Sequence, residues 1–238
     1  MKGGLTRLKR KVLAADLDRT LTPGGETLVP PNILNLLAEL KRRGWLLILV
    51  TGRDRFYIES RRDLSGVFDG WVLENGVEIC LPEKGFSKVF LPESWEAVRQ
   101  QAARFPFISW KRWTFSLPRD RLGEVAGFLG KLGIPLSYKD NRGLIYVLPS
   151  GIDKGTGLLR LLEALNVEGW IAALGDAHVD LDLFRVADFK ATVDDAEEEV
   201  KLAADYISPL PDGMGAEEIL KRLLKGEFTP ENQSSRCS

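Results

Sequence analysis

The chain has 238 residues, of which 44% are hydrophobic and 28% charged, as in a globular protein of one large or two small domains. Its 33 Lys and Arg and 34 Asp and Glu residues leave a net charge of −1, which argues against nucleic acid as the main partner. Two cysteines imply no disulfide framework, and one histidine disfavours zinc sites and triads that need several. With no membrane-spanning apolar run and no signal-peptide pattern, we expect a cytoplasmic protein with no membrane partner.

The first predicted strand is short and apolar, and it opens into an acidic loop. Val12–Ala15 has the composition of a buried parallel strand, and Asp16 and Asp18 follow it before Pro23-Gly24-Gly25 stops regular structure. Residues i and i+2 of a strand point to the same side, about 6–7 Å apart. Two carboxylates placed in this way repel each other unless a cation, such as a hard divalent ion, lies between them. The alternative is a pair of turn and helix-capping aspartates.

Strands and helices then alternate, as they do in a parallel α/β sheet. In chain order we expect a helix opened by Pro30-Pro31-Asn32 and ended by Gly44, and a buried strand over 45–50 that ends at Thr51-Gly52-Arg53. A helix follows through about Leu64, and then a strand over 70–73 that ends at Glu74-Asn75-Gly76. The same pattern resumes later. There we expect a helix over 154–165, a buried strand over 170–174 before Gly175-Asp176, shorter strands near 189–193 and 206–207, and a closing helix over 216–224.

Between residues 82 and 149 the strands are more amphipathic, and the order resembles β-α-β-β-α-β. We expect a strand over 87–91, a helix over 92–104, a strand over 107–117, a helix opened by Pro118, and strands over 135–139 and 143–148 joined by the hairpin turn Asp140-Asn141-Arg142. The sequence therefore predicts an α/β core formed by residues 1–81 and 150–226, an inserted α+β domain over 82–149, and a polar tail over 227–238.

Polar side chains fall at comparable places in the core. Asp16 and Asp18 follow the first strand, Thr51 follows the second, Lys154 opens a helix, and Asp176 follows the next strand. Ligands of doubly wound sheets bind at these strand ends, near the switch in strand order. Carboxylates would hold a cation, a hydroxyl and an ammonium would neutralise phosphoryl oxygens, and one aspartate could attack phosphorus. Taken singly, Thr51 could be a helix cap and Lys154 a surface lysine, so only the joint pattern favours phosphate chemistry.

These motifs resemble those of the haloacid dehalogenase (HAD) superfamily of phosphatases over residues 10 to 225. Asp16-Leu17-Asp18-Arg19-Thr20-Leu21-Thr22 is similar to its first motif, Asp-x-Asp-Gly-Thr-Leu-Thr. The second, third and fourth motifs resemble Leu49-Val50-Thr51-Gly52-Arg53, Asp153-Lys154-Gly155 and Gly175-Asp176-Ala177-His178-Val179-Asp180. The insert resembles the type IIB cap of the Cof-like and archaeal phosphoglycolate phosphatase branch, as does Glu74-Asn75-Gly76. The resemblance implies a Rossmann-like parallel-sheet core with an inserted type IIB cap domain.

The resemblance also implies a Mg2+-dependent phosphatase that works through an aspartyl-phosphate. Asp16 would be the nucleophile, and Asp18 the general acid and then the base. Mg2+ would be held by the Asp16 carboxylate, the Asp18 backbone carbonyl and Asp176, with Asp180 supporting it directly or through water. Thr51 and Lys154 would hold the phosphoryl group.

The cap stretch Ser109-Trp110-Lys111-Arg112-Trp113-Thr114 points to the substrate. On an alternating strand, Lys111 and Arg112 lie on opposite sides, and one side could offer a cation to a carboxylate. The alternative is that the tryptophans pack on the cap helices and the cations are solvated. The stretch loosely resembles a cap region of phosphoglycolate phosphatases, so we expect phosphoglycolate or another small phosphorylated acid, with a sugar phosphate as the alternative. The expected substrate-binding residues are Thr51, Gly52, Arg53, Lys111, Arg112 and Lys154.

Two departures from the motifs leave other functions open. Arg19 stands where the first motif has glycine, and Val179 stands where an asparagine often precedes the second acid of the fourth motif. A degenerate member that binds phosphate without turnover is therefore an alternative. His178 is expected to be an exposed loop residue. Receiver modules are shorter and lack a cap, and no P-loop spacing is present. A monomer and a homodimer are both compatible with the sequence.

Overall fold

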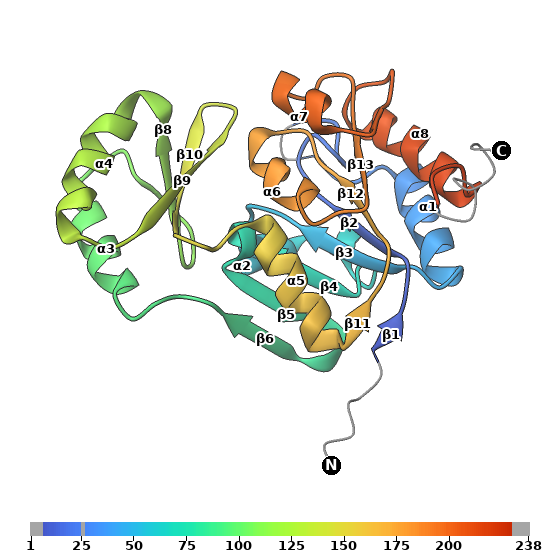
Figure 1. Cartoon of the computed structure of the whole chain (residues 1–238), viewed down its shortest axis with the longest axis horizontal. Helices are drawn as coiled ribbons and strands as arrows, with labels where there is room; N and C mark the ends of the chain where they lie inside the picture. The colour runs from blue at the N-terminus through green and yellow to red at the C-terminus, as the bar shows by residue number, and fades with distance from the viewer. Residues whose placement is uncertain (1–6, 25–26, 230–238) are drawn as a thin grey trace, which may run out of the picture.

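The computed structural model describes residues 7–24 and 27–229 and contains a larger α/β unit and a smaller α+β unit (Figure 1). The larger unit is built on an 8-stranded sheet in which the strands from β14 to β4 are parallel and β5 and β6 are antiparallel. In sheet order the strands are β14 (Tyr206–Ile207), β13 (Phe189–Thr192), β12 (Ile171–Leu174), β2 (Val12–Ala15), β3 (Leu46–Val50), β4 (Gly70–Leu73), β5 (Glu78–Leu81) and β6 (Phe86–Val89). A separate 2-stranded sheet pairs β1 (Leu8–Lys9) with β11 (Val167–Glu168).

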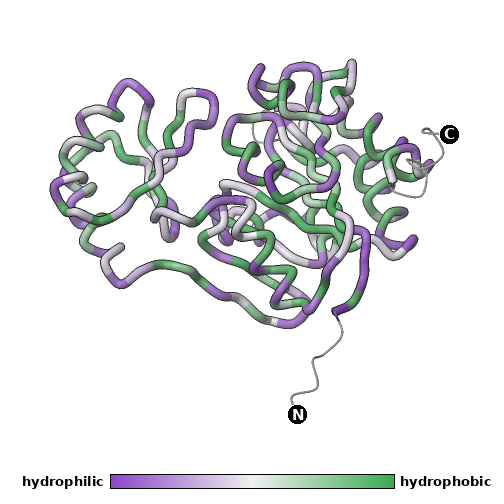
Figure 2. The backbone as a smooth tube through the Cα atoms, viewed as in Figure 1, coloured by the Kyte–Doolittle hydropathy of each residue, from purple (hydrophilic) through white to green (hydrophobic). Residues whose placement is uncertain are grey.

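Helices cover both faces of the large sheet, which is why its central strands are apolar without interruption. In β2, Leu13 and Ala15 face α1 (Pro31–Arg42) and α8 (Asp212–Leu224), whereas Val12 and Ala14 face α5 (Lys154–Leu165). The short helices are α2 (Arg55–Ser60) on the first face and α6 (Leu181–Phe184) and α7 (Glu198–Ala203) on the second. Figure 2 shows the hydrophobic segments gathered in these strands and on the inner sides of the helices.

The order of the strands reverses between β2 and β12. The chain continues from β2 to β3 and β4 on one side, and from β12 to β13 and β14 on the other. Loops that leave two such strands diverge and form a crevice at the carboxyl end of the sheet. Asp16 directly follows β2, and Asp176 lies two residues beyond β12, so both reach this crevice. The predicted α/β fold with a parallel-sheet core is confirmed.

The smaller unit, here called the cap, is an antiparallel sheet with two helices on the side away from the core (Figure 1). The sheet order is β7-β8-β10-β9. The bounds are α3 (Trp95–Ala102), β7 (Ser109–Trp110), β8 (Phe115–Pro118), α4 (Leu122–Leu129), β9 (Leu136–Asn141) and β10 (Leu144–Pro149). Trp95, Val98, Phe115 and Val147 pack in its own hydrophobic core. The 3-10 turns of the chain are η1 (Arg62–Leu64), η2 (Glu74–Gly76), η3 (Pro82–Lys84), η4 (Arg119–Arg121), η5 (Gly130–Leu132) and η6 (His178–Asp180).

Several segments differ from the predicted elements. The closing helix begins at Asp212 instead of residue 216, and β5 was not expected. The strand expected over 87–91 corresponds to β6, which pairs with β5 at the edge of the large sheet. This strand therefore belongs to the core sheet, although the predicted insert begins at residue 82. The helix expected to reach Leu64 ends at Ser60, and η1 follows. The strand expected over 107–117 is instead a hairpin, in which β7 and β8 pair antiparallel. Its residues 113 and 114 donate their backbone N–H groups to Glu74 of the core instead of to a neighbouring strand.

The end of the described chain packs on the core. Phe228 falls in the predicted polar tail, yet its ring stacks on Phe189 at a centroid distance of 4.5 Å. The rest of that tail, residues 230–238, lies outside the described residues. Across the described helices, none combines the length and apolar character that crossing a membrane requires.

Candidate active site

Lys154 lies at the centre of the crevice and bridges two buried carboxylates. Its Nζ is 2.6 Å from Asp16 Oδ1 and 2.6 Å from Asp180 Oδ1, and its side chain is 2% exposed. Asp153 fixes the start of α5 by a capping box with Thr156, which aims Lys154 at the end of the sheet. Although burial lowers the pKa of Lys154, the attraction of Asp16 and Asp180 outweighs it and raises the pKa above the ordinary value. The ammonium therefore stays charged.

Three carboxylates converge at this point. Oxygens of Asp16, Asp176 and Asp180 lie within 4.8 Å of one another, and all three residues are buried. Burial raises the pKa of Asp16 well above its ordinary value, with Lys154 opposing the shift and the neighbouring acids adding to it. Burial and then Asp180 raise the pKa of Asp176 to about 6. The three buried acids repel one another, and all of their candidate ligand atoms are carboxylate oxygens. Both features fit a hard divalent cation of the Mg2+ type.

Both carboxylate oxygens of Asp180 accept hydrogen bonds. Oδ1 accepts from Lys154, and Oδ2 accepts the backbone N–H groups of Asp176 and Ala177, each at 3.0 Å. These bonds order the loop after β12 and hold the Asp176 side chain towards the crevice. The geometry suits a supporting role for Asp180 better than a free metal-ligand role.

The predicted second-motif residues lie on the other side of Asp16. Arg53 donates from Nε and Nη2 to the two oxygens of Asp18, both at 2.9 Å, and its guanidinium lies 4.2 Å from the centre of the Tyr57 ring. The Thr51 hydroxyl, which is buried, accepts the backbone N–H of Arg53 at 3.1 Å. The Asp18 carboxylate thus pairs with Arg53, and the Thr51 hydroxyl is bonded within its own loop.

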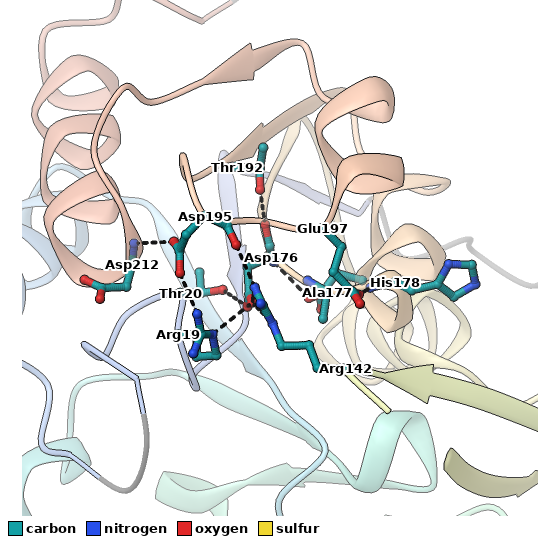
Figure 3. Close-up of polar contacts among 12 residues, drawn as sticks. Arg19, Thr20, Arg142, Asp176, Ala177, His178, Thr192, Asp195, Glu197 and Asp212 are labelled. Atoms are coloured by element: carbon teal, nitrogen blue, oxygen red, sulfur yellow. Dashed lines mark hydrogen bonds and ion pairs between the residues drawn. The ribbon is translucent and has the colours of Figure 1, made fainter. Parts of the chain in front are cut away.

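The cap contributes Arg142, which the sequence analysis treated only as a turn residue. Arg142 Nη2 and Nε lie 2.7 Å and 3.1 Å from Asp176 Oδ2, and Nη2 also donates to the Asp195 carbonyl at 2.9 Å. Figure 3 shows the side chain reaching from the β9–β10 turn to the acid loop. Lys139 of the same hairpin pairs with Asp182 of the core at 2.7 Å. In the sequence, the only indication of this contact is that an arginine stands in a predicted hairpin turn.

Lys111 and Arg112 lie in the loop between β7 and β8 and point in different directions. Lys111 Nζ is 5.6 Å from the centre of the Tyr146 ring. The Tyr146 hydroxyl lies beside Gly52 of the second-motif loop, and burial, and then the charge of Arg53, lowers the pKa of Lys111. Arg112 instead packs its guanidinium over the exposed ring of Phe56 at 5.1 Å. The structure therefore brings Lys111 to the site and leaves Arg112 at the rim.

Glu74 connects this cap loop to the core. The residue is fully buried at the end of β4, and its Oε2 accepts the backbone N–H of Thr114 at 2.7 Å and the Thr114 hydroxyl at 2.6 Å. Trp113 adds its own backbone N–H at 3.1 Å and donates its ring N–H to Glu78 at 2.8 Å. Burial raises the pKa of Glu74. The sequence signal was an acid at a strand end, which could not by itself reveal a partner in the cap.

Known proteins match both the motifs and the fold. Residues 128–220 match the family of haloacid dehalogenase-like hydrolases. "Phosphoglycolate phosphatase 2" of Saccharolobus solfataricus is 31% identical over 225 residues, which cover 92% of this chain and 95% of that protein. The chain belongs to the haloacid dehalogenase-like hydrolases. "Phosphoglycolate phosphatase" of Sulfurisphaera tokodaii is 28% identical over 90% of this chain and 94% of its own length.

Solved HAD structures share the two-unit fold. The subclass IIB sugar phosphatase BT4131 superposes with a TM-score of 0.71 over 90% of this chain and 98% of its own, at 17% identity. The chain is accordingly a phosphomonoester hydrolase of the HAD superfamily with a type IIB cap.

The structure shows how the first HAD motif accommodates Arg19 in place of glycine. Arg19 has a φ of 62°, a conformation that favours the glycine of the motif. Its guanidinium pairs with Asp195 at 2.7 Å, and its Nε lies 4.0 Å from Asp176 Oδ2 (Figure 3). The extra charge therefore sits on the Arg142 side of the acid cluster. His178 is 46% exposed and pairs with Glu199, as expected for a loop residue.

Proposed function

We propose that this HAD phosphatase hydrolyses a small phosphorylated acid, with phosphoglycolate as the first candidate, in a Mg2+-dependent reaction through an aspartyl-phosphate on Asp16. The observation that best supports this proposal is the buried contact of Asp16 with Lys154, beside Asp176. It supports a reaction in which Asp16 is the nucleophile, Lys154 a fixed cation and the acid cluster a divalent-ion site. Two of the similar proteins are named phosphoglycolate phosphatases, which supports this substrate.

The chemistry follows from the positions of the side chains. The Asp16 carboxylate forms a bond to phosphorus while the bond to the ester oxygen breaks, and that oxygen takes a proton from Asp18. Water then attacks phosphorus and returns a proton to Asp18, which frees Asp16 and inorganic phosphate. Lys154 and the Thr51 hydroxyl hold phosphoryl oxygens. Mg2+, held by Asp16, Asp176 and the Asp18 carbonyl, would neutralise phosphoryl charge.

The ion pair between Asp18 and Arg53 links substrate binding to proton transfer. In the structure both Asp18 oxygens accept hydrogen bonds from Arg53. A substrate carboxylate is chemically equivalent to the Asp18 side chain and can take over the Arg53 guanidinium. Asp18 is then released for its role as an acid. Lys111, on the cap side, supplies a second cation for the same carboxylate.

Phosphate release tests this function. Wild type and Asp16→Asn are assayed with phosphoglycolate, sugar phosphates and a generic aryl phosphate, with Mg2+ and with EDTA. We expect multiple turnovers by wild type with Mg2+ only, the highest kcat/KM with phosphoglycolate, and no turnover by Asp16→Asn, whose fold is checked by circular dichroism. Activity in Asp16→Asn would refute the assignment of the nucleophile, and a preference for sugar phosphates would refute the substrate.

A further inference from the structure

Asn75 is a buried amide beside the phosphate-binding loop that has no hydrogen-bond partner for its side chain among the described residues. The residue is 1% exposed, and neither Nδ2 nor Oδ1 finds a partner. Buried polar groups in native proteins are hydrogen-bonded in the large majority of cases, and an exception needs an explanation. No catalytic role in the proposed reaction uses this residue.

The backbone holds Asn75 firmly in an unusual conformation. Its φ and ψ of 55° and 37° are left-handed, as is the φ of 46° at Glu74. The Asn75 N–H donates to the Thr51 carbonyl at 3.1 Å, which fastens the turn to the second-motif loop. Strained backbone of this kind clusters at functional sites, where the surrounding structure maintains it. The turn therefore aims the amide in one direction.

The amide is aimed at Gly52. A Cβ atom at Gly52 would lie 3.3 Å from both Nδ2 and Oδ1 of Asn75 and 3.2 Å from the Tyr146 hydroxyl of the cap. A core amide and a cap hydroxyl therefore pack closely against Gly52, where a larger residue would crowd both. Lys111 lies over the Tyr146 ring, and Arg53 follows Gly52 in the chain. The surroundings are cationic and rich in donors, which suits an anionic oxygen.

We propose that Asn75 is a further substrate-binding residue, whose Nδ2–H group donates a hydrogen bond to an anionic oxygen of the bound substrate. The inference rests on the proposed phosphatase function. The oxygen belongs either to the phosphoryl group or to the substrate carboxylate, and the same donor chemistry serves both. The side-chain amide of a purely structural asparagine would instead form hydrogen bonds with backbone groups, as in capping and turn asparagines.

Asn75→Gly removes the amide and keeps a residue that tolerates the left-handed backbone. Asn166→Gly is the matched control, because Asn166 has the same φ of 55° at the end of α5, outside the crevice. We expect Asn75→Gly to raise the KM for phosphoglycolate about tenfold with a much smaller change in kcat, and Asn166→Gly to leave both unchanged. Asn75→Asp, which replaces the donor with a negative charge, should raise KM further.

Two measurements identify the oxygen and separate this inference from the function on which it rests. Weaker calorimetric binding of inorganic phosphate to Asn75→Gly, together with a raised KM for the aryl phosphate, assigns the phosphoryl group. A raised KM for phosphoglycolate alone assigns the carboxylate. If Asn75→Gly matches Asn166→Gly in all three measurements, the inference is overturned. If wild type has no turnover, the proposed function fails, and phosphate binding alone then decides the role of Asn75.

Discussion

The Arg142 guanidinium, at the tip of the cap hairpin, donates two hydrogen bonds to a single oxygen of Asp176, at 2.7 Å and 3.1 Å. Asp176 also belongs to the acid cluster that fits a divalent cation. The same oxygen therefore attracts a cap residue and a cation. This contact and the pair of Lys139 with Asp182 join the cap to the core, so we expect a cation at Asp176 to compete with the Arg142 contact.

Replacing Arg142 by glutamine should tighten Mg2+ binding to the substrate-free protein. The variant removes a competing positive charge from Asp176, and hydrogen bonds to charged groups are worth about 1.5–3 kcal/mol, so we expect a roughly tenfold lower Kd. Calorimetric titration with Mg2+ measures it. Arg119→Gln is the control, because Arg119 pairs with Asp140 inside the cap. An unchanged or weaker Mg2+ affinity in Arg142→Gln would show that the two cations do not compete.

Lys154 should contribute to stability as well as to catalysis. Lys154→Met leaves Asp16 and Asp180 buried without the cation between them, so the free energy of unfolding should fall by about 3–5 kcal/mol in EDTA. Adding Asp180→Asn to Lys154→Met should recover part of this loss, because it removes one of the two stranded charges. Urea unfolding followed by circular dichroism gives both values. A loss below about 1 kcal/mol would contradict the electrostatic account of this buried triad.

The two neighbouring cations of the cap loop should have unequal effects on the substrate. Lys111 is half-buried beside Arg53, so Lys111→Ala should raise the KM for phosphoglycolate about tenfold and leave that of an aryl phosphate nearly unchanged. Arg112 packs on Phe56 at the rim, so Arg112→Ala should change either KM by less than about twofold. Steady-state kinetics of the two variants in parallel decide the matter. Equal effects would mean that the whole loop, rather than Lys111, binds the anion.

The core and its acid cluster could be predicted because their signals are local. The apolar run of β2 and the acids after it are adjacent in the sequence, and strands that end on one edge of a sheet bring Asp16, Thr51 and Asp176 together whatever the details of the packing. Lys154 could be placed for the same reason, since it opens a helix that directly follows the cap. In a parallel sheet, residues that directly follow different strands therefore lie close together in space, even when they are far apart in the sequence.

What could not be predicted depends on side chains that reach across the two units. Arg142 was assigned to a turn, and nothing near it in the sequence indicates Asp176 as its partner. The expected strand over 107–117 looked continuous because its composition is strand-like. The chain instead reverses between Trp110 and Phe115, and the Glu74 carboxylate accepts the N–H groups of Trp113 and Thr114 in that turn. Tertiary contacts of this kind override local propensity.

The KM for phosphoglycolate should rise on the alkaline side in a way that depends on Lys111. Burial and then Arg53 lower the pKa of Lys111 below the ordinary 10.5, so the ammonium loses its proton at a lower pH than a free lysine does. Each step towards alkaline pH therefore removes attraction for the substrate carboxylate. Lys111→Arg keeps its charge throughout, because a guanidinium does not titrate in this range.

KM measured from about pH 7 to about pH 10 should consequently rise for wild type and stay flatter for Lys111→Arg. An aryl phosphate without a carboxylate, measured in parallel, corrects for the titration of groups that act on the phosphoryl side. Because the shift is downward, the divergence between the two enzymes must grow as the pH increases and shrink as the pH falls. Curves that remain parallel over the whole range would show that Lys111 does not meet the substrate carboxylate.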